Sequence, residues 1–293
     1  MSQAAVDDLI ELLDLEPIEV NIFRGNSPKE DRQRVFGGQV AGQALVAAAR
    51  TVDDERSVHS MHAYFLRPGD PSLPILYEVD RIRDGRSFTT RRVVAIQHGK
   101  AIFNLAASFQ VHEEGLEHSF EMPEVPGPEG LPGRRDRLTA YFEQRDDIDD
   151  PHGMAAFIDR PQAIDTRIAN WSPEDRAESL PPYQHVWLRA DGVLPEDPLL
   201  QTIVLTYASD MTLLDTALLP HGGSWFDPTL FMASLDHAMW FHRPFRADQW
   251  LLYSQDTPTA TNSRGLARGL VFTQEGTLVA SVVQEGLIRV ARS

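Results

Sequence analysis

The chain has 293 residues, of which 42% are hydrophobic and 24% charged, an ordinary composition for a globular protein long enough to form two medium-sized domains. With 27 Lys and Arg against 43 Asp and Glu, the formal net charge is −16, so nucleic acid would be repelled at long range. The sequence contains no cysteine, which excludes disulfides, thiolate metal sites and a cysteine nucleophile.

The N-terminal segment does not resemble a targeting sequence. It carries Asp7, Asp8 and Glu11, where a secretory signal needs a basic start and an uninterrupted apolar run. No stretch of the chain approaches the ~18 apolar residues that would span a bilayer. We therefore expect a cytoplasmic protein that has neither a membrane nor a nucleic acid as a partner.

The first half reads as one helix followed by several strands. Apolar residues recur at helical spacing between Val40 and Ala48, and the abundance of Ala and Gly there lets a helix lie close against a sheet. Consecutive strands after a single helix indicate an α+β fold with an antiparallel sheet rather than a parallel βαβ fold. The strands are expected at 57–66, 75–82, 88–97 and 101–111, where β-branched and aromatic residues predominate.

A linker is expected at 121–133, EMPEVPGPEGLPG, because its interleaved prolines and glycines cannot continue a helix or a central strand. After it, 138–145 is compatible with a short helix, and 163–171 and 183–192 read as strands that open a second domain. The predicted organisation is an N-terminal domain over 1–115, a Pro-rich linker and connecting segment over 116–159, and a C-terminal domain over 160–293.

The second half repeats the pattern of the first. Each half places an apolar helix before an aromatic strand that ends in Arg-Pro, at Arg67 and Arg243, and a glycine turn precedes the last strand, at Gly99 and Gly276. The two pairs are separated by nearly the same distance along the chain, which indicates an internal duplication.

Several long segments identify the family that the chain resembles. They are VFGGQVAGQAL, HSMHAYFLRPGDP, RDGRSFTTRRVVAIQ, SLDHAMWFHRPF and LVASVVQEGLIR, and they are similar to the acyl-CoA thioesterase II family over nearly the whole chain. The resemblance implies a tandem (double) hotdog fold, in which each half is an antiparallel sheet wrapped around a central helix. It also implies an enzyme that hydrolyses fatty acyl-CoA to free fatty acid and CoA.

The resemblance further implies which residues hold the attacking water. They are an Asp at the start of the second helix, a Thr on the following strand and a Gln on the last strand. In this sequence these positions carry Asp210, Ser234 and Gln284. Ser234 departs from the family pattern, although it keeps the hydroxyl group.

These residue types suit thioester hydrolysis. A carboxylate can accept a proton from water while a hydroxyl and an amide orient that water, so no covalent intermediate is needed. Asp210 is the expected base, with an ordinary N-cap as its alternative role. Gly37 and Gly38 occupy the corresponding place in the first half, where no base is possible, so we expect one site per fused pair. Their backbone N–H groups are expected to bind substrate by polarising the thioester carbonyl.

Two other functions remain open. A hotdog hydratase or dehydratase acting on acyl-CoA would use Asp236 and His237, although adjacent strand residues point to opposite faces. A non-catalytic acyl-CoA-binding protein is the second alternative. The presence of Asp210 and Gln284 weighs against it, although Gln284 also has a structural alternative role, in which it is hydrogen-bonded to the neighbouring backbone within an apolar strand.

The remaining expectations concern ligands and assembly. No metal site is expected, because the spacing of His59 and His62 does not suit two ligands on one strand face, and no cofactor motif is present. CoA requires a local cationic patch on this acidic chain, and Arg91 and Arg264 represent the two candidate clusters. We also expect a homo-oligomer.

Overall fold

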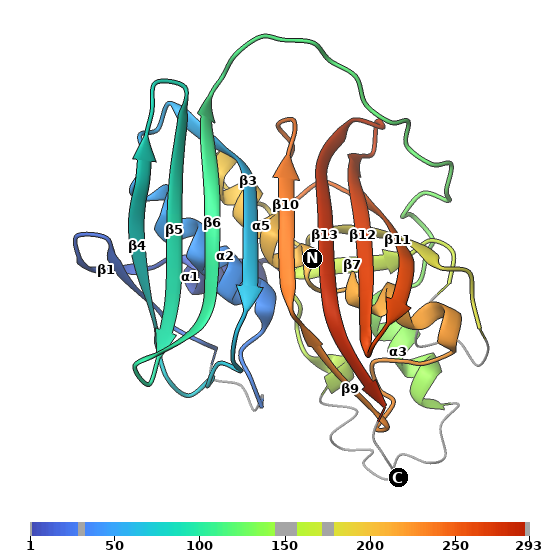
Figure 1. Ribbon diagram of the computed structural model, residues 1–293. Helices are drawn as coiled ribbons and strands as arrows, with labels where there is room; N and C mark the ends of the chain where they lie inside the picture. Colours follow the sequence, from blue (N-terminus) through green and yellow to red (C-terminus); the bar gives the residue numbers. More distant parts are fainter. Residues whose placement is uncertain (1, 29–32, 144–156, 172–178, 291–293) are drawn as a thin grey trace.

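The computed structural model describes residues 2–28, 33–143, 157–171 and 179–290 (Figure 1). The first half contains α1 (Gln3–Leu13), β1 (Glu16–Glu19), β2 (Ile22–Gly25), α2 (Gly37–Ala49), β3 (Arg56–Phe65), β4 (Ile75–Asp84), β5 (Phe88–Gln97) and β6 (Lys100–Val111). The second half contains α3 (Arg134–Glu143), β7 (Ile164–Ile168), β8 (Tyr183–Ala190), α5 (Pro198–Ser209), the 3₁₀ helix η1 (Leu214–His221), β9 (Leu230–Ser234), β10 (Asp236–Phe241), β11 (Leu251–Thr261), β12 (Arg264–Thr273) and β13 (Leu278–Val290).

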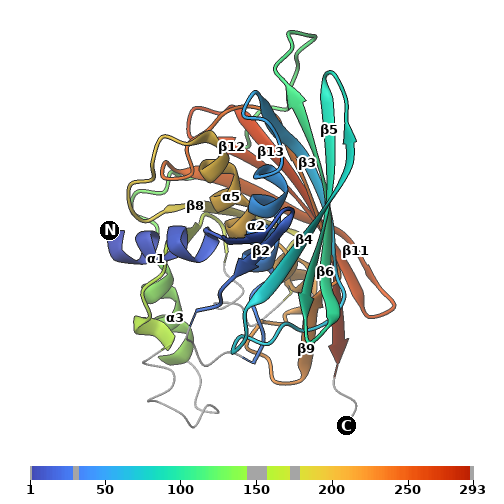
Figure 2. The ribbon, with the colours of Figure 1, turned by 90° about the vertical axis from the view of Figure 1, so that its left-hand side faces the viewer.

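The strands form one continuous sheet that joins the two halves. Its order is β1-β2-β4-β5-β6-β3-β10-β13-β12-β11-β8-β7, with β9 paired to β13. The halves meet where β3 and β10 pair antiparallel, with Met61 opposite Met239. The helices α2 and α5 lie together on one face of this sheet (Figure 2). Each half therefore wraps an antiparallel sheet around a central helix, which is the predicted tandem hotdog arrangement.

The repeat in the sequence is also a repeat in the geometry. Arg67 donates through Nη1 to the carbonyl of Ala101, and Arg243 donates through Nη1 to the carbonyl of Leu278. In both halves the arginine of the Arg-Pro pair thus binds the backbone at the start of the last strand of that half, β6 or β13. The glycine before that strand has a positive φ in both halves, +67° in one and +92° in the other, a conformation that favours glycine.

The two central helices run antiparallel in close contact. A Cβ added to Gly38 of α2 would lie 2.3 Å from the carbonyl oxygen of Tyr207 in α5, and one added to Gly42 would lie 3.6 Å from the Ile203 side chain. The start of α2 therefore meets the end of α5. These ends carry opposite partial charges, since the first N–H groups of a helix and its last carbonyls lack partners within the helix.

The start of the second helix was predicted incorrectly. The helix begins at Pro198, after Asp197, whose side chain accepts a hydrogen bond from the N–H of Leu199 at 2.9 Å. Asp210 follows the end of α5 and is not its N-cap. The prediction was wrong because the apolar pattern continues from α5 into η1, so that one apolar run of sequence covers two separate helices.

The prediction that Gly37 and Gly38 occupy in the first half the position that Asp210 occupies in the second is also wrong. The residue that follows α2, as Asp210 follows α5, is Arg50, while the counterpart of the Gly37 helix start is Pro198. Gly37 and Gly38 do not replace Asp210 in the first half. They face it across the helix junction.

Residues 112–133 leave β6 and reach the second half without forming a helix or a strand (Figure 1). This segment packs on the sheet: the Pro126 carbonyl accepts a hydrogen bond from Trp187 Nε1 at 2.8 Å, and Met122 and Leu131 contact the same apolar cluster. The expected helix over 138–145 begins earlier, at Arg134, and its last two expected residues lie outside the described residues. The expected strand pair is β7 and β8, at the edge of the sheet.

Within the part of the chain that the structure describes, no helix has the length and apolar character needed to cross a bilayer.

The contact between α2 and α5 yields a stability prediction. Gly38→Ala places a methyl group against the backbone of Tyr207, which cannot rotate away, so we expect a loss of about 2–3 kcal/mol in the free energy of unfolding. Gly115→Ala is the matched control, because a Cβ there meets no atom within 4 Å. Urea denaturation of both variants measures the difference. Equal stability of the two would show that the helices are not held at this distance.

Candidate active site

Asp210, Ser234 and Gln284 come together at the junction of the two halves. Gln284, on β13, donates through Nε2 to Asp210 Oδ1 at 2.6 Å and to Ser234 Oγ at 2.9 Å. Ser234, at the end of β9, donates through Oγ to the same Asp210 oxygen at 3.3 Å. The three residues form a closed hydrogen-bonded triangle around one carboxylate oxygen.

The second carboxylate oxygen of Asp210 faces the start of α2. A Cβ added to Gly37 would lie only 2.6 Å from Oδ2, so only glycine allows this approach. The backbone N–H of Gly38 donates a hydrogen bond to the Asp210 carboxylate. The first half thus contributes backbone groups to the site, and the second half contributes side chains.

Burial makes Asp210 a stronger base than an ordinary aspartate. Desolvation raises the pKa of Asp210 from 3.8 to about 6, against the opposing effects of the hydrogen bonds from Gln284, Gly38 and Ser234 and the positive charge of Arg34. The residue as a whole is partly exposed to solvent. A carboxylate with a pKa near 6 is mostly ionised at neutral pH and can still accept a proton, which suits general-base catalysis.

Arg34 belongs to this site, although no motif in the sequence indicated it. The residue lies just before α2 and donates through Nη2 to the carbonyl of Met232 at 2.7 Å. Its guanidinium also lies 5.8 Å from the ring centre of Phe231. Arg34 therefore ties the first half to β9, the strand that carries Ser234, and places a positive charge near Asp210.

Gln284 is fully buried in an otherwise apolar strand. Its amide nitrogen makes both bonds within the triangle, and no hydrogen-bond partner is found for Oε1 among the described residues. A buried amide whose donors both point to a carboxylate and its neighbouring hydroxyl orients those groups.

Asp236 and His237 have different hydrogen-bond partners. Asp236 accepts a hydrogen bond from the backbone N–H of Glu285 at 2.7 Å. His237 is buried and contacts Ser209 through Nε2 at 2.8 Å. The two side chains leave opposite faces of β10 and have different partners.

The two arginines expected to bind CoA lie in different settings. Arg91 is 1% exposed and donates to Thr51 and Asp84 near the end of α2, about 20 Å along that helix from Gly37. Its position and its internal partners leave it unsuited to binding CoA. Arg264 is partly exposed and pairs with Glu285 at 2.8 Å, on the sheet face opposite the Gln284 side chain.

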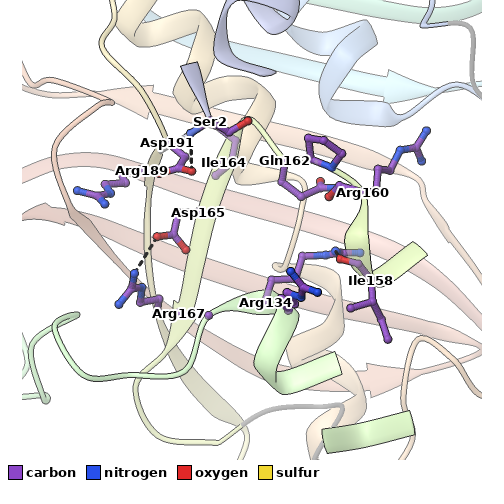
Figure 3. A pocket seen from close by; sticks show the side chains of 13 residues that line it. Ser2, Arg134, Ile158, Arg160, Gln162, Ile164, Asp165, Arg167, Arg189 and Asp191 are labelled. Atoms are coloured by element: carbon purple, nitrogen blue, oxygen red, sulfur yellow. Dashed lines mark hydrogen bonds and ion pairs between the residues drawn. The ribbon is translucent and has the colours of Figure 1, made fainter. Parts of the chain in front are cut away.

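A cavity of about 400 Å³ lies elsewhere, between the start of α3, β7 and the N-terminal end of α1 (Figure 3). Several arginines line it, but their charges are already engaged: Arg167 pairs with Asp165 at 3.1 Å, and the Arg189 guanidinium lies 4.3 Å from the Trp250 ring centre. None of the residues in the Asp210 triangle lines this cavity. The candidate active site is therefore at the helix junction.

The two histidines weighed as metal ligands have ordinary partners. His59 contacts Ser108 Oγ at 2.9 Å, and the His62 ring packs edge-to-face against Trp240 with ring centres 5.1 Å apart. Across the described ranges, no three His, Asp or Glu side chains are grouped so that they could hold a metal ion.

Comparisons with known proteins agree with this architecture. The family model described as acyl-CoA thioesterase matches residues 157–287, and that of the acyl-CoA thioesterase N-terminal domain matches 27–110. The chain is 44% identical to acyl-coenzyme A thioesterase 8 of Homo sapiens, covering 95% of this chain and 88% of that protein. It is 40% identical to acyl-CoA thioesterase 2 of Haemophilus influenzae, covering 97% and 98%.

Among solved structures, the chain is similar to the acyl-CoA thioesterase II TesB2 of Mycobacterium marinum. That structure has a TM-score of 0.78 and 46% sequence identity, with 96% of this chain and 97% of that one covered. The chain belongs to the acyl-CoA thioesterase II family and is a thioester hydrolase with the tandem hotdog fold.

The raised pKa of Asp210 predicts a pH-dependent stability cost. Between the unfolded pKa of 3.8 and the folded value of about 6, the folded state binds more protons, so this residue destabilises the fold as pH rises through that range. Asp210→Asn removes the buried charge. We expect its stability relative to the wild type to increase by about 2–3 kcal/mol between about pH 4 and about pH 8.

Chemical denaturation over this pH range measures the difference. Asp8→Asn, at an exposed position on α1, is the control and should follow the wild type throughout. A pH-independent difference between Asp210→Asn and the wild type would mean that burial does not perturb Asp210.

Proposed function

We propose that the chain hydrolyses fatty acyl-CoA to free fatty acid and CoA, with Asp210 as the general base. The observation that carries this proposal is the Asp210 carboxylate at the helix junction, which is held by Gln284 and Ser234 and has a pKa raised to about 6. The names of the relatives support acyl-CoA as the substrate.

In the proposed reaction, a water molecule lies against Asp210 Oδ2 and transfers a proton to it as its oxygen attacks the thioester carbon. The tetrahedral intermediate then breaks its carbon–sulfur bond. The proton held by Asp210 passes to the departing sulfur, so that the products are the fatty acid and the CoA thiol. A thioester needs no stronger nucleophile, because sulfur donates poorly into the carbonyl and leaves readily.

Ser234 and Gln284 act on the carboxylate in this proposal. Both bond to Oδ1, which fixes the plane of the carboxylate and leaves Oδ2 to accept the proton. This role differs in detail from the expectation that they hold the water itself. By orienting the base, these two neutral side chains contribute to catalysis.

The start of α2 supplies the groups that polarise the carbonyl. Gly38 N–H is engaged with Asp210, which leaves the N–H of Gly37 and the positive end of the helix for the developing oxyanion. Phe36 and Tyr207 pack edge-to-face beside this junction, with ring centres 5.0 Å apart. An apolar surrounding of this kind strengthens such electrostatic contacts.

The test is release of free CoA thiol from acyl-CoA by the purified protein, with and without EDTA. We expect EDTA-insensitive turnover, and we expect Asp210→Asn to lower kcat by on the order of 10² to 10⁴, the usual contribution of a general base. Isothermal titration with a non-hydrolysable acyl-CoA thioether checks that the variant still binds the ligand.

Ser234 provides the matched pair of control variants. Ser234→Thr retains the hydroxyl and should keep near wild-type turnover, while Ser234→Ala loses the bond to Asp210 Oδ1 and should turn over more slowly. Turnover that survives in folded Asp210→Asn would rule out the proposed base. Binding of acyl-CoA without any release of thiol by the wild type would instead favour a non-catalytic binding protein.

A further inference from the structure

The end of α5 that presents Asp210 is anchored to the sheet of the second half. His237 projects from β10 toward the last helical residue, Ser209, and its Nε2 lies 2.8 Å from Ser209 Oγ. Both side chains are buried, with 1% and 0% exposure. Ser209 directly precedes Asp210, so a contact that fixes Ser209 also fixes the start of the loop that carries the base.

The hydrogen-bonding capacities of the two side chains set the direction of this bond. The Ser209 hydroxyl has one proton and lies 2.9 Å from the Thr206 carbonyl, the strongest acceptor within its reach besides the imidazole. Burial lowers the pKa of His237 to about 4, so the ring is neutral at working pH and has a single N–H. Both donors are satisfied when His237 Nε2–H donates to Ser209 Oγ and the hydroxyl donates to Thr206.

A second contact holds the backbone of the same residue. The hydroxyl of Tyr253, on β11, donates to the Ser209 carbonyl at 3.3 Å. The Tyr253 ring is held in turn by Gly269, where an added Cβ would lie 2.2 Å from the ring. Side chains from two strands therefore grip one residue at the helix terminus.

A helix terminus without such contacts is prone to fraying, because its last carbonyls have no partners within the helix. Fraying by one residue at Ser209 would swing Asp210 away from Gln284 and from the start of α2. A displacement of about 1 Å in a catalytic group can cost about 10²-fold in rate.

We infer that His237 is a positioning residue of the hydrolase, which sets the direction of the Asp210 carboxylate through its hydrogen bond to Ser209 and does not touch the substrate. The inference rests on the proposed role of Asp210. It gives His237 a function different from that of an acid or base in hydration chemistry, because the imidazole lies within the core and bonds to a helix end.

The experiment is a double-mutant cycle on kcat with His237→Leu and Ser209→Ala. Each single variant should lower kcat by about 10- to 100-fold while KM changes less than about threefold. The double variant should be no slower than the slower single variant, since both changes break one bond. His237→Gln retains an amide donor at the position of Nε2 and should recover most of the activity.

Val93→Ala is the control for stability, because it opens a cavity in the core of the first half, on β5, whereas Asp210, Ser234 and Gln284 all belong to the second half. Thermal unfolding measures the stability of every variant. The kcat of Val93→Ala then shows how far a loss of stability alone lowers kcat. If His237→Leu does not fold, the comparison of Ser209→Ala with the wild type and with Ser209→Ala/His237→Gln still tests the bond.

The inference is overturned if the fold losses of the two single variants multiply in the double variant. It is also overturned if the single variants lose no more kcat than Val93→Ala does for the same loss of stability. It is also overturned if His237→Gln is as slow as His237→Leu at equal stability. Loss of turnover in Asp210→Asn together with full turnover in His237→Leu would remove this inference alone. Full turnover in Asp210→Asn would remove the proposed function itself.

Discussion

The site depends on a single buried carboxylate placed where the end of one helix meets the start of another. Asp210 follows α5, and the first residues of α2 pack so closely on it and on the end of α5 that Gly37 and Gly38 admit no side chain. The partial positive charge at the start of α2 and the amide of Gln284 stabilise the ionised form, while burial opposes ionisation and dominates. The outcome is a base whose pKa lies near 6 instead of 3.8.

The same constraint explains why two similar halves form one site. The antiparallel contact of α2 with α5 creates a second junction, between the end of α2 and the start of α5. There Arg50 occupies the position that follows the helix, and Pro198 begins the other helix without an N–H to donate. Arg50 bonds to Asp14 and the Leu15 carbonyl, which secures the N-terminal segment. The second junction therefore presents an arginine where the first presents Asp210, and a proline where the first presents the N–H of Gly37.

Much of this architecture could be predicted from the sequence. The alternation of strand residues, the Gly-Pro linker and the duplicated Arg-Pro and glycine positions identified two antiparallel halves, and the structure repeats their geometry. Asp210, Ser234 and Gln284 were named through the family resemblance, and the structure brings them together. The periodicity of the sequence could not place the end of α5, because the apolar run passes from α5 into η1. The signal that could have placed the start of α5 is Asp197-Pro198, a capping residue followed by proline at the first helical position.

Contacts between distant segments were beyond the reach of sequence patterns. Arg34 contacts β9 across nearly 200 residues, and nothing in its local sequence separates it from a surface arginine. Arg91 looked like part of a solvated cationic strand face, yet it is buried beneath the end of α2, where it donates to the Thr51 carbonyl. In both cases the partners of the arginine come from a distant strand or helix end. Those partners are set by the assembled fold, which local sequence patterns do not describe.

The pH dependence of kcat/KM for acyl-CoA hydrolysis tests the central claim most directly, because it reports the ionisation of the free enzyme's essential base. A buried Asp210 predicts a plateau at neutral pH and a one-proton decline centred at about 6. In folded Asp210→Asn, the residual activity should lose this decline. A profile that stays flat down to about pH 4.5, as expected for an aspartate near its ordinary pKa, would contradict the account.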